Sequence, residues 1–165
     1  MDRYNERLIK SKPNGTAFLP IIGACILTAG AIPLVLLSPP IGVLLLALGI
    51  FLITYTKDFL DIEYEFILTN GDIDISRIYA KKRRKVVGTL EAEKVAAMDS
   101  ADSDSVKNDI SIGRIKPVFY VGKGDDGKRV IIYIGEGEQK ESYVLDLDDK
   151  CIEHLKQVYK NKCRI

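Results

Sequence analysis

No charged side chain occurs between Pro13 and Thr56, although the 165-residue sequence holds 24 Lys and Arg and 23 Asp and Glu elsewhere. The sequence also has no Trp, a single His and three Cys. A net charge of +1 excludes a strongly basic nucleic-acid-binding protein and a strongly acidic disordered chain, so we expect no nucleic-acid partner. The single histidine excludes a metal site or a proton relay that needs two histidines.

The uncharged segment predicts two membrane-spanning helices. A bilayer core is roughly 30 Å thick and needs about 20 apolar residues for each helical span. Ser38-Pro39-Pro40 lies near the middle of the segment, and consecutive prolines disfavour helix in the residue before them, so we expect a turn there. The predicted spans are about Ala17–Leu37 and about Ile41–Thr56, with the second extending as far as Leu60.

A secretory signal peptide is the alternative, because Arg7, Lys10 and Lys12 precede the apolar run. However, the first run exceeds the apolar core of a signal peptide, which is roughly 7–15 residues long, and a second span follows at once. The favoured interpretation is a membrane hairpin.

The positions of Lys and Arg predict the orientation of this hairpin. Four cations precede span one, Lys57 and the run Lys81–Lys85 follow span two, and the turn between the spans carries none. Since cytoplasmic flanks are enriched in Lys and Arg, we expect a cell-membrane protein with two spans and both termini in the cytoplasm.

Each predicted span carries two glycines seven residues apart. These are Gly23 and Gly30 in span one and Gly42 and Gly49 in span two. Glycines at this spacing share one helix face, where small residues let backbones approach closely. We expect them to pack the two spans together, and pairing with another protein or a second copy is the alternative. The spans hold no Asp, Glu, Lys, Arg or His, so a transporter is not expected.

The residues after the spans are typical of short strands. Apolar and polar residues alternate from Ile62 to Leu68, and Asn70-Gly71 is a strong two-residue hairpin signal before a return strand at about Asp72–Tyr79. In that strand Ile73 and Ile75 are expected inward.

A third strand is expected through Val86–Leu90, after the basic run, and Lys94–Met98 fits a short strand or a helical turn. Asp99–Lys116 is rich in Asp and Ser and predicts a long loop. Three further strands are expected at about Pro117–Val121, Arg129–Ile134 and Glu141–Leu147, with turns at Gly122–Gly127 and Gly135–Glu138. Asp148 is expected to cap a helix that reaches about Lys160, with one face formed by Ile152, Leu155, Val158 and Tyr159.

Seven strands and one amphipathic helix predict an α+β domain in which the helix closes a small antiparallel β-barrel or sandwich. This order is similar to the pleckstrin-homology-like (PH-like) superfold. The predicted organisation is an N-terminal cytoplasmic segment (1–16), a transmembrane hairpin (17–60) and a PH-like cytoplasmic domain (61–165).

The whole chain resembles a family of small bacterial membrane proteins of unknown function with two N-terminal spans. The matching motifs are Glu63-Tyr64-Glu65-Phe66, Thr69-Asn70-Gly71, Asp72-Ile73-Asp74-Ile75 and Lys81-Lys82-Arg83-Arg84-Lys85. The resemblance implies a fold and a location, and little about activity.

Motifs that carry chemistry are weak in this sequence. Gly122–Gly127 matches G-x-G-x-x-G by letters, but that motif binds a dinucleotide only between a strand and a helix. Strands are expected on both sides here, and Asp125 and Asp126 would repel phosphate, so we interpret the segment as a hairpin turn.

Metal and redox sites are not expected either. The acidic loop lacks the spacing, the turn glycine and the terminal Glu of a calcium loop; its acidic residues are Asp99, Asp102, Asp104 and Asp109. Cys151 and Cys163 are too far apart for a close metal pair, and cytoplasmic thiols are reduced. His154 is expected to be an exposed or half-buried structural residue. Nucleophile motifs and phosphate-binding loops are absent from the sequence, so we expect no enzyme activity, metal or cofactor.

The basic run Lys81, Lys82, Arg83, Arg84 and Lys85 is the candidate site for lipid or partner binding. Near an anionic leaflet each cation contributes about 1 kcal/mol, although neighbouring carboxylates offset part of this. A solvated strand end that enforces topology is the alternative. The sequence thus predicts a membrane-tethered, non-catalytic binding or scaffolding module in which a protein partner is favoured over anionic lipid, and the alternative is a structural subunit of a larger membrane complex.

Overall fold

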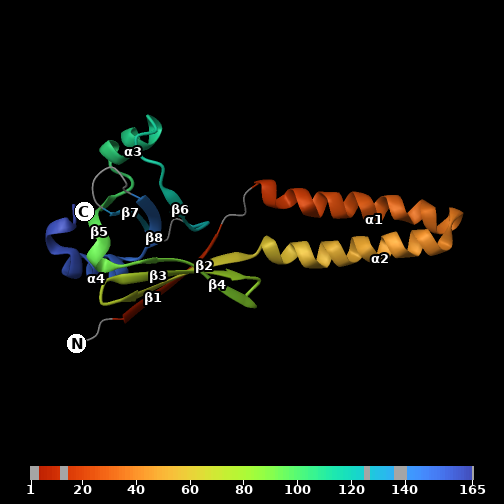
Figure 1. Cartoon of the computed structure of the whole chain (residues 1–165), viewed down its shortest axis with the longest axis horizontal. Coiled ribbons are helices and arrows are strands. Elements are labelled where there is room, and N and C mark those ends of the chain that lie inside the picture. The colour runs from red at the N-terminus through yellow and green to blue at the C-terminus, as the bar shows by residue number, and fades with distance from the viewer. Residues whose placement is uncertain (1–3, 12–14, 125–126, 136–140, 165) are drawn as a thin grey trace. The chain divides into compact units, whose positions relative to one another are not determined.

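The computed structural model describes residues 4–11, 15–124, 127–135 and 141–164 (Figure 1). The chain divides into two units. One unit comprises Met1–Lys12, Glu63–Ile78 and Arg84–Ile165, and the other comprises Pro13–Ile62 and Tyr79–Arg83. The N-terminal residues therefore belong to the same unit as the C-terminal half of the chain, with the helical unit inserted between them.

The helical unit is a pair of apolar helices, α1 (Leu19–Leu37) and α2 (Pro39–Thr56), which lie side by side in Figure 1. Short 3-10 turns at Gly15–Phe18 and Lys57–Phe59 extend them. The chain reverses at Ser38, as predicted, and α2 starts with Pro39 and Pro40, where a missing backbone N–H removes no helical hydrogen bond.

Both helices are long and apolar enough to cross a membrane. Only 11% and 17% of the residues in their apolar windows are buried, so they are not covered as the core helices of a soluble domain are. Their length and exposure are consistent with membrane insertion.

The first sheet contains four strands in the order β1-β2-β3-β4. Their bounds are Tyr4–Lys10 for β1, Ile62–Thr69 for β2, Asp72–Tyr79 for β3 and Arg83–Leu90 for β4. β1 pairs antiparallel with β2 along its whole length, from Tyr4 opposite Thr69 to Lys10 opposite Glu63. This sheet therefore joins segments from both ends of the helical hairpin.

β1 is a strand that was not predicted from the sequence, and it brings the number of strands among the described residues to eight instead of seven. The cations that precede the first span were interpreted only as topology signals. Three of its seven residues are charged, which conceals the alternation. Its partner strand also lies 53 positions further along the chain, so no local turn signal marks the pairing.

The second sheet has the order β5-β7-β8-β6. Its strands are β5 (Val95–Ser100), β6 (Val118–Tyr120), β7 (Lys128–Ile134) and β8 (Glu141–Leu147). β7 is antiparallel to both β5 and β8, whereas β6 runs parallel to β8. The described strands form two sheets, one of them mixed, so the predicted antiparallel barrel or sandwich is confirmed only in part: the strands do not close into a barrel, and not all of them are antiparallel.

Several local predictions are confirmed. The Asn70-Gly71 turn has positive φ at both residues, 53° and 104°, as a two-residue hairpin turn requires. β3 has the predicted bounds, and its Ile73 and Ile75 are fully buried. Of the two alternatives for Lys94–Met98, the structure has the strand, β5, which begins at Val95 after a 3-10 turn at Ala92–Lys94.

The predicted loop at Asp99–Lys116 is wrong at its centre, where the helix α3 (Asp104–Ser111) forms. Val106 on this helix is buried, and it packs with Ala101, Ile131 and Val144, while Ile110 covers the same cluster. Burial of these apolar side chains outweighs the weak helix propensity of a segment rich in Asp and Ser.

The C-terminal helix α4 (Asp149–Tyr159) is confirmed, and Asp148 caps it by accepting a hydrogen bond of 2.9 Å from the Cys151 backbone N–H. Ile152, Leu155 and Tyr159 are buried as expected, but Val158 is 38% exposed. His154 is buried, and not exposed or half-buried as predicted, because its ring lies 3.0 Å from the side chain of Asn5 on β1. The unpredicted strand β1 therefore accounts for this error too.

Candidate binding surface at the basic turn and the edge of β4

The basic run begins in the tight turn between β3 and β4. Ala80 and Lys81 have φ values of 48° and 57°, and the Lys82 N–H donates a hydrogen bond of 2.9 Å to the Tyr79 carbonyl. Positive φ is unfavourable for residues other than glycine. The turn therefore needs compensating contacts, and these come from the end of α2.

Three contacts hold this turn against the residues that follow α2, all within the helical unit. The Ala80 N–H donates a hydrogen bond of 2.7 Å to the Asp61 carbonyl, and Lys82 Nζ lies 3.6 Å from Asp58 Oδ2. The rings of Tyr79 and Phe59 meet edge to face with centroids 5.9 Å apart. The basic turn is thus fixed to the last residues of the second apolar helix.

Aromatic rings continue from this turn along α2. Phe59 also contacts Tyr55, with centroids 5.4 Å apart, and Tyr55 stacks on Phe51 at 6.2 Å. Tyr and Trp are typical of the level where a membrane meets water, because the ring is apolar and its hydroxyl or N–H is polar. Tyr55 and Tyr79 are therefore two residues of this kind, joined through Phe59 at the end of α2.

All five cations of the run are exposed, and they differ in their partners. Lys82 pairs with Asp58, and Arg84 pairs with Glu65. Lys81, Arg83 and Lys85 make no ion pair with any residue that the structure describes. These three side chains leave a local positive charge at the start of β4.

β4 forms one edge of the first sheet, and no strand among the described residues pairs with its outer side. Arg83, Arg84, Lys85 and Val86 are exposed along its first half, Val86 to 61%. Exposed edges attract further strands, and natural proteins place Lys and Arg on them to prevent aggregation. The cations on this edge are therefore placed where they hinder pairing with a further basic strand.

Glu65 lies behind this edge and is 2% exposed. Burial raises the pKa of Glu65 above its ordinary range, although the Arg84 guanidinium acts in the opposite direction. The sequence analysis treated Glu63 and Glu65 as the polar face of a half-buried strand. Both are buried, because β2 is a central strand flanked by β1 and β3.

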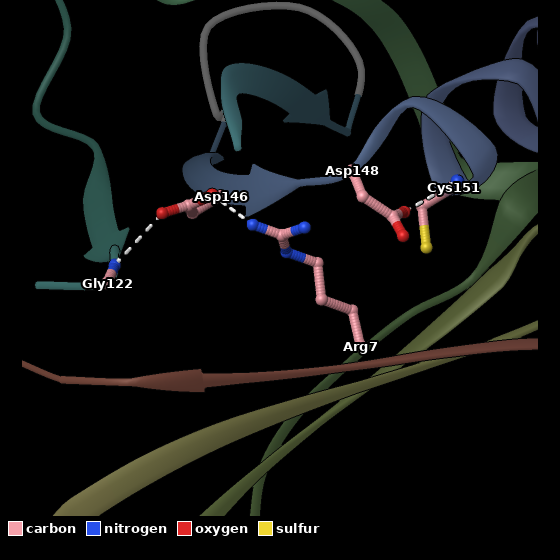
Figure 2. A network of polar contacts seen from close by, with 5 residues as sticks. All are labelled: Arg7, Gly122, Asp146, Asp148 and Cys151. Atoms are coloured by element: carbon pink, nitrogen blue, oxygen red, sulfur yellow. Dashed lines mark hydrogen bonds and ion pairs between the residues drawn. The ribbon is translucent and has the colours of Figure 1, made fainter. Parts of the chain in front are cut away.

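A second polar network joins β1 to the second sheet (Figure 2). Arg7 Nη2 donates to Asp146 Oδ1 on β8 at 3.0 Å, and the Gly122 N–H donates to the other carboxylate oxygen at 3.3 Å. Burial alone would raise the pKa of Asp148, but its hydrogen bonds from Cys151 and the charges of Arg7 and Lys150 outweigh burial and lower it.

The Gly122–Gly127 segment is not the predicted hairpin turn, because β6 and β7 lie on opposite sides of β8 and do not pair with each other. Asp125 and Asp126 lie outside the described residues, as does most of the predicted Gly135–Glu138 turn. A Cβ at Gly122 would lie 3.1 Å from Asp146 Oδ2, and one at Gly127 would collide with the same carboxylate. These glycines make room for Asp146, which the letters of a dinucleotide motif do not indicate.

The four span glycines have different surroundings. A Cβ at Gly42 would collide with the Val35 backbone, and one at Gly49 would collide with the Thr28 side chain. Gly42 and Gly49 thus let α1 and α2 approach each other, as predicted for one of the two pairs. Nothing in the described chain lies within 4 Å of a Cβ built at Gly23 or Gly30.

Within the described residues, no three His, Cys, Asp or Glu side chains are grouped so that they could hold a metal ion. The three cysteines are free thiols, with Cys25 exposed, Cys151 buried and Cys163 partly exposed. Burial raises the pKa of Cys151 to about 12, and the Asp148 carboxylate beside it acts in the same direction. Such a thiol remains protonated at neutral pH and is a poor nucleophile.

Comparison with known proteins bears on the fold. The model of one protein family, described as a bacterial PH-like domain (DUF6106), matches residues 1–165. No curated protein and no solved structure is similar enough to match the chain. The two sheets, the C-terminal helix and the family match over the whole chain agree, and the protein belongs to this family of bacterial PH-like domains.

Proposed function

We propose that this protein is a membrane-tethered, non-catalytic binding module that holds an extended acidic segment of a partner protein along β4, with anionic lipid as a secondary contact. The free, positively charged edge of β4 carries this proposal. An added strand gains main-chain hydrogen bonds from such an edge, and the charges select the partner. Two copies joined through β4 would bring their basic runs together, so this edge disfavours a homodimer.

The outer edges of β1, β5 and β6 are less suitable than β4 for binding an added strand. The C-terminal segment covers part of β5, since the Arg164 N–H donates to the Met98 carbonyl at 2.8 Å. Ser11, just after β1, forms a bridge with Gly122, and β6 is only three residues long. Among the described strands, β4 offers the longest uncovered edge.

The pairing of β1 with β2 supports the proposed topology. β1 precedes the first apolar helix and β2 follows the second, so both ends of the hairpin must lie on one side of a membrane for the strands to pair. The cations that flank the hairpin favour the cytoplasmic side. A protein with two spans and both termini in the cytoplasm meets these conditions.

The secondary lipid contact is proposed for the turn at Lys81–Arg83. The turn is fixed to the residues after α2 and lies beside Tyr55 and Tyr79. Exposed cations close to an anionic leaflet are attracted to it, and this attraction weakens as the salt concentration rises.

The experiment uses the full chain in its native membranes, with a photo-crosslinking amino acid in place of Val86 on β4. The expected result is a discrete protein adduct that the Arg83→Glu, Lys85→Glu variant forms roughly ten-fold less well, because like charges repel an acidic partner. The matched control, Lys94→Glu with Lys107→Glu, reverses two exposed cations outside β4 and should leave the yield unchanged.

Three results would contradict the proposal. The first is adducts with lipid alone, which would make lipid the main partner. The second is an equal yield of the same adduct from a crosslinker at Ile112, an exposed residue far from β4 in the sequence. The third is turnover of a substrate by the purified chain alone, which would contradict the non-catalytic assignment.

The alternative function is a structural subunit of a larger membrane complex assembled through the hairpin. The open face at Gly23 and Gly30 favours it, because this small-residue face is not used between α1 and α2. Under this alternative, replacing both glycines with Leu dissociates the complex in native gels, while crosslinking from Val86 is lost only as a consequence. Under the proposed function, the same variant keeps its crosslinks.

A further inference from the structure

The first residues of β4 present different side chains on the two faces of the first sheet. Neighbouring residues of a strand point to opposite faces, so Arg83 and Lys85 share one face and Arg84 and Val86 share the other. All four are exposed, and no strand among the described residues pairs with the outer side of β4. A segment added along this edge therefore meets both faces at once, and its own side chains alternate between them.

The face that carries Arg84 is identified by its ion-pair partner Glu65 on β2. Glu6 on β1 lies on the same face, because it is two residues from Leu8, which pairs with Glu65 in the strand register. Burial raises the pKa of Glu65, the Arg84 guanidinium lowers it, and the nearby Glu6 carboxylate raises it further. One guanidinium thus lies near two carboxylates on this face, and a further acidic side chain would be repelled.

Val86 follows Arg84 on this face and is 61% exposed. An apolar side chain laid beside Val86 would remove both from water, which is favourable. Arg84 cannot leave Glu65 without cost, because Glu65 is buried and would then be an uncompensated charge. This face of β4 therefore favours apolar side chains on an added strand.

The opposite face carries the positive charge of this edge. Arg83 and Lys85 form no ion pair with any residue that the structure describes. Arg77 on β3 adds positive charge to this face, since its guanidinium lies 5.3 Å from the ring of Tyr64, which neighbours Glu65 on β2 and so points the other way. Acidic side chains opposite Arg83 and Lys85 are stabilised, and on a strand such positions are two residues apart.

We propose that the segment held along β4 is an amphipathic strand in which acidic and apolar residues alternate. Its acidic residues face Arg83 and Lys85, and its apolar residues lie on the face of Arg84 and Val86. This inference rests on the proposed function, because it specifies the partner for the same edge. It distinguishes such a partner from a uniformly acidic segment, which would place every second carboxylate on the face of Glu65.

The test uses synthetic peptides of equal length and charge and the full chain in phosphatidylcholine nanodiscs. In the first peptide Glu alternates with Val, in the second the same residues form a Glu block and a Val block, and in the third Ser replaces each Val. Nonspecific electrostatic attraction is the same for all of them, since their charges are equal. Fluorescence anisotropy should give a Kd for the first peptide that is roughly five-fold lower than for either of the others.

Variants connect this preference to the two faces of β4. Lys85→Gln should weaken binding of the first peptide roughly three-fold, because a Glu of the peptide loses its cation. The matched control Lys94→Gln, which removes a 61% exposed lysine outside β4, should leave the Kd unchanged. Glu65→Gln makes Arg84 available to an acidic side chain, so the difference between the first two peptides should shrink. Its control, Glu63→Gln, removes a buried carboxylate that lies opposite Lys10 instead, and should preserve the difference.

Equal Kd values for the first two peptides would overturn the alternation while leaving binding at this edge, and hence the proposed function, in place. A preference that is unchanged in Glu65→Gln would overturn the assigned faces.

If no peptide binds, the natural partner decides the question, because tandem mass spectrometry of the Val86 adduct identifies the cross-linked segment. Alternating acidic and apolar residues in that segment support the inference, and an acidic segment without alternation overturns it. The absence of any protein adduct at Val86 is instead the failure of the proposed function, and this inference then fails with it.

Discussion

Arg7 and Asp146 are 139 positions apart in the sequence, and their side chains form a 3.0 Å ion pair between β1 and β8. The side chains are 13% and 5% exposed, so each charge depends on the other for most of its compensation. This pair connects the strand that precedes the apolar hairpin to the last strand of the second sheet.

We expect Arg7→Ala to destabilise the folded unit by about 3 kcal/mol, because it leaves the Asp146 charge buried and unpaired. Native-state hydrogen exchange of the β1 and β8 amides measures this free energy in the full chain. The matched control is Lys128→Ala, which removes an exposed pair with Asp149 and should cost less than about 1 kcal/mol. Equal effects of the two variants would show that the Arg7 pair is not structurally important.

Substitution of Gly71 tests how closely the turn between β2 and β3 packs against α4. Its φ of +104° is unfavourable for any other residue, and an added Cβ would lie 2.6 Å from Val158 Cγ1. Gly71→Ala should therefore lower the free energy of unfolding by about 2 kcal/mol. Gly88→Ala on β4 is the control, since nothing lies within 4 Å of its added Cβ. Thermal unfolding of the two variants should differ by several degrees.

Glu65 should make stability depend on pH in a defined direction. Burial raises its pKa in the folded state, so the folded chain holds this proton more tightly than the unfolded chain does. Its contribution to stability is complete below the ordinary pKa of Glu, about 4.3, and is lost as the pH rises through the raised value. The Tm of Glu65→Gln, relative to wild type, should increase from pH 4 to pH 7.

The Asp148→Asn variant should show a dependence of Tm on pH that is opposite in direction to that of Glu65→Gln. Hydrogen bonds from Cys151, assisted by the positive charge of Arg7, lower the pKa of Asp148 despite its burial, so its stabilisation is present above the ordinary pKa of Asp and lost on acidification. The Tm of Asp148→Asn, relative to wild type, should decrease as the pH rises from about 2 to about 5 and then stay constant up to pH 7. Parallel trends for the two variants would contradict both assignments.

Replacing a span glycine with leucine should lower the stability of the helix pair at some positions and not at others. Gly49→Leu would force the two helices apart at Thr28, at a cost of about 1–3 kcal/mol, whereas Gly23→Leu meets open space. Thermal denaturation in detergent micelles, followed by size-exclusion chromatography, compares the two. The assigned packing face is wrong if Gly23→Leu is the less stable variant.

Thiol labelling tests the environment of α4. In a Cys25→Ala background, N-ethylmaleimide at pH 8 should modify the partly exposed Cys163 and leave Cys151 unmodified until the chain unfolds. Cys151 is 1% exposed and its pKa is raised to about 12, so the reactive thiolate is scarce and inaccessible. Rapid labelling of Cys151 in the folded chain would contradict this packing.

Most helices and strands could be predicted from local signals in the sequence, because a turn or a helix cap is encoded by a few adjacent residues. The Asn70-Gly71 turn sets the register of β2 and β3, and Asp148 marks the start of α4. Helices and strands that depend on contacts between distant segments have no such local signal in the sequence. β1 could not be assigned without its partner 53 positions away, and α3 depends on a cluster that includes Ile131 and Val144 from other elements.

The candidate surface was predicted in part. The letters Lys81–Lys85 marked the basic run, but whether each cation is paired depends on Asp58 and Glu65, which the fold brings to it. Likewise, spacing placed the glycines of each span on one face and could not tell that Gly42 and Gly49 meet α1 while Gly23 and Gly30 do not.

The pairing of β1 with β2 also affects how the protein is made. Tyr4–Lys10 is synthesised before both apolar helices, and its partner strand is synthesised only after them. Under the proposed topology, the first strand stays without its partner strand until both helices have inserted. A nascent chain whose second helix fails to return to the starting side keeps the two strands apart. Under the proposed topology, the first sheet is therefore complete only in a chain whose second helix has returned to the starting side.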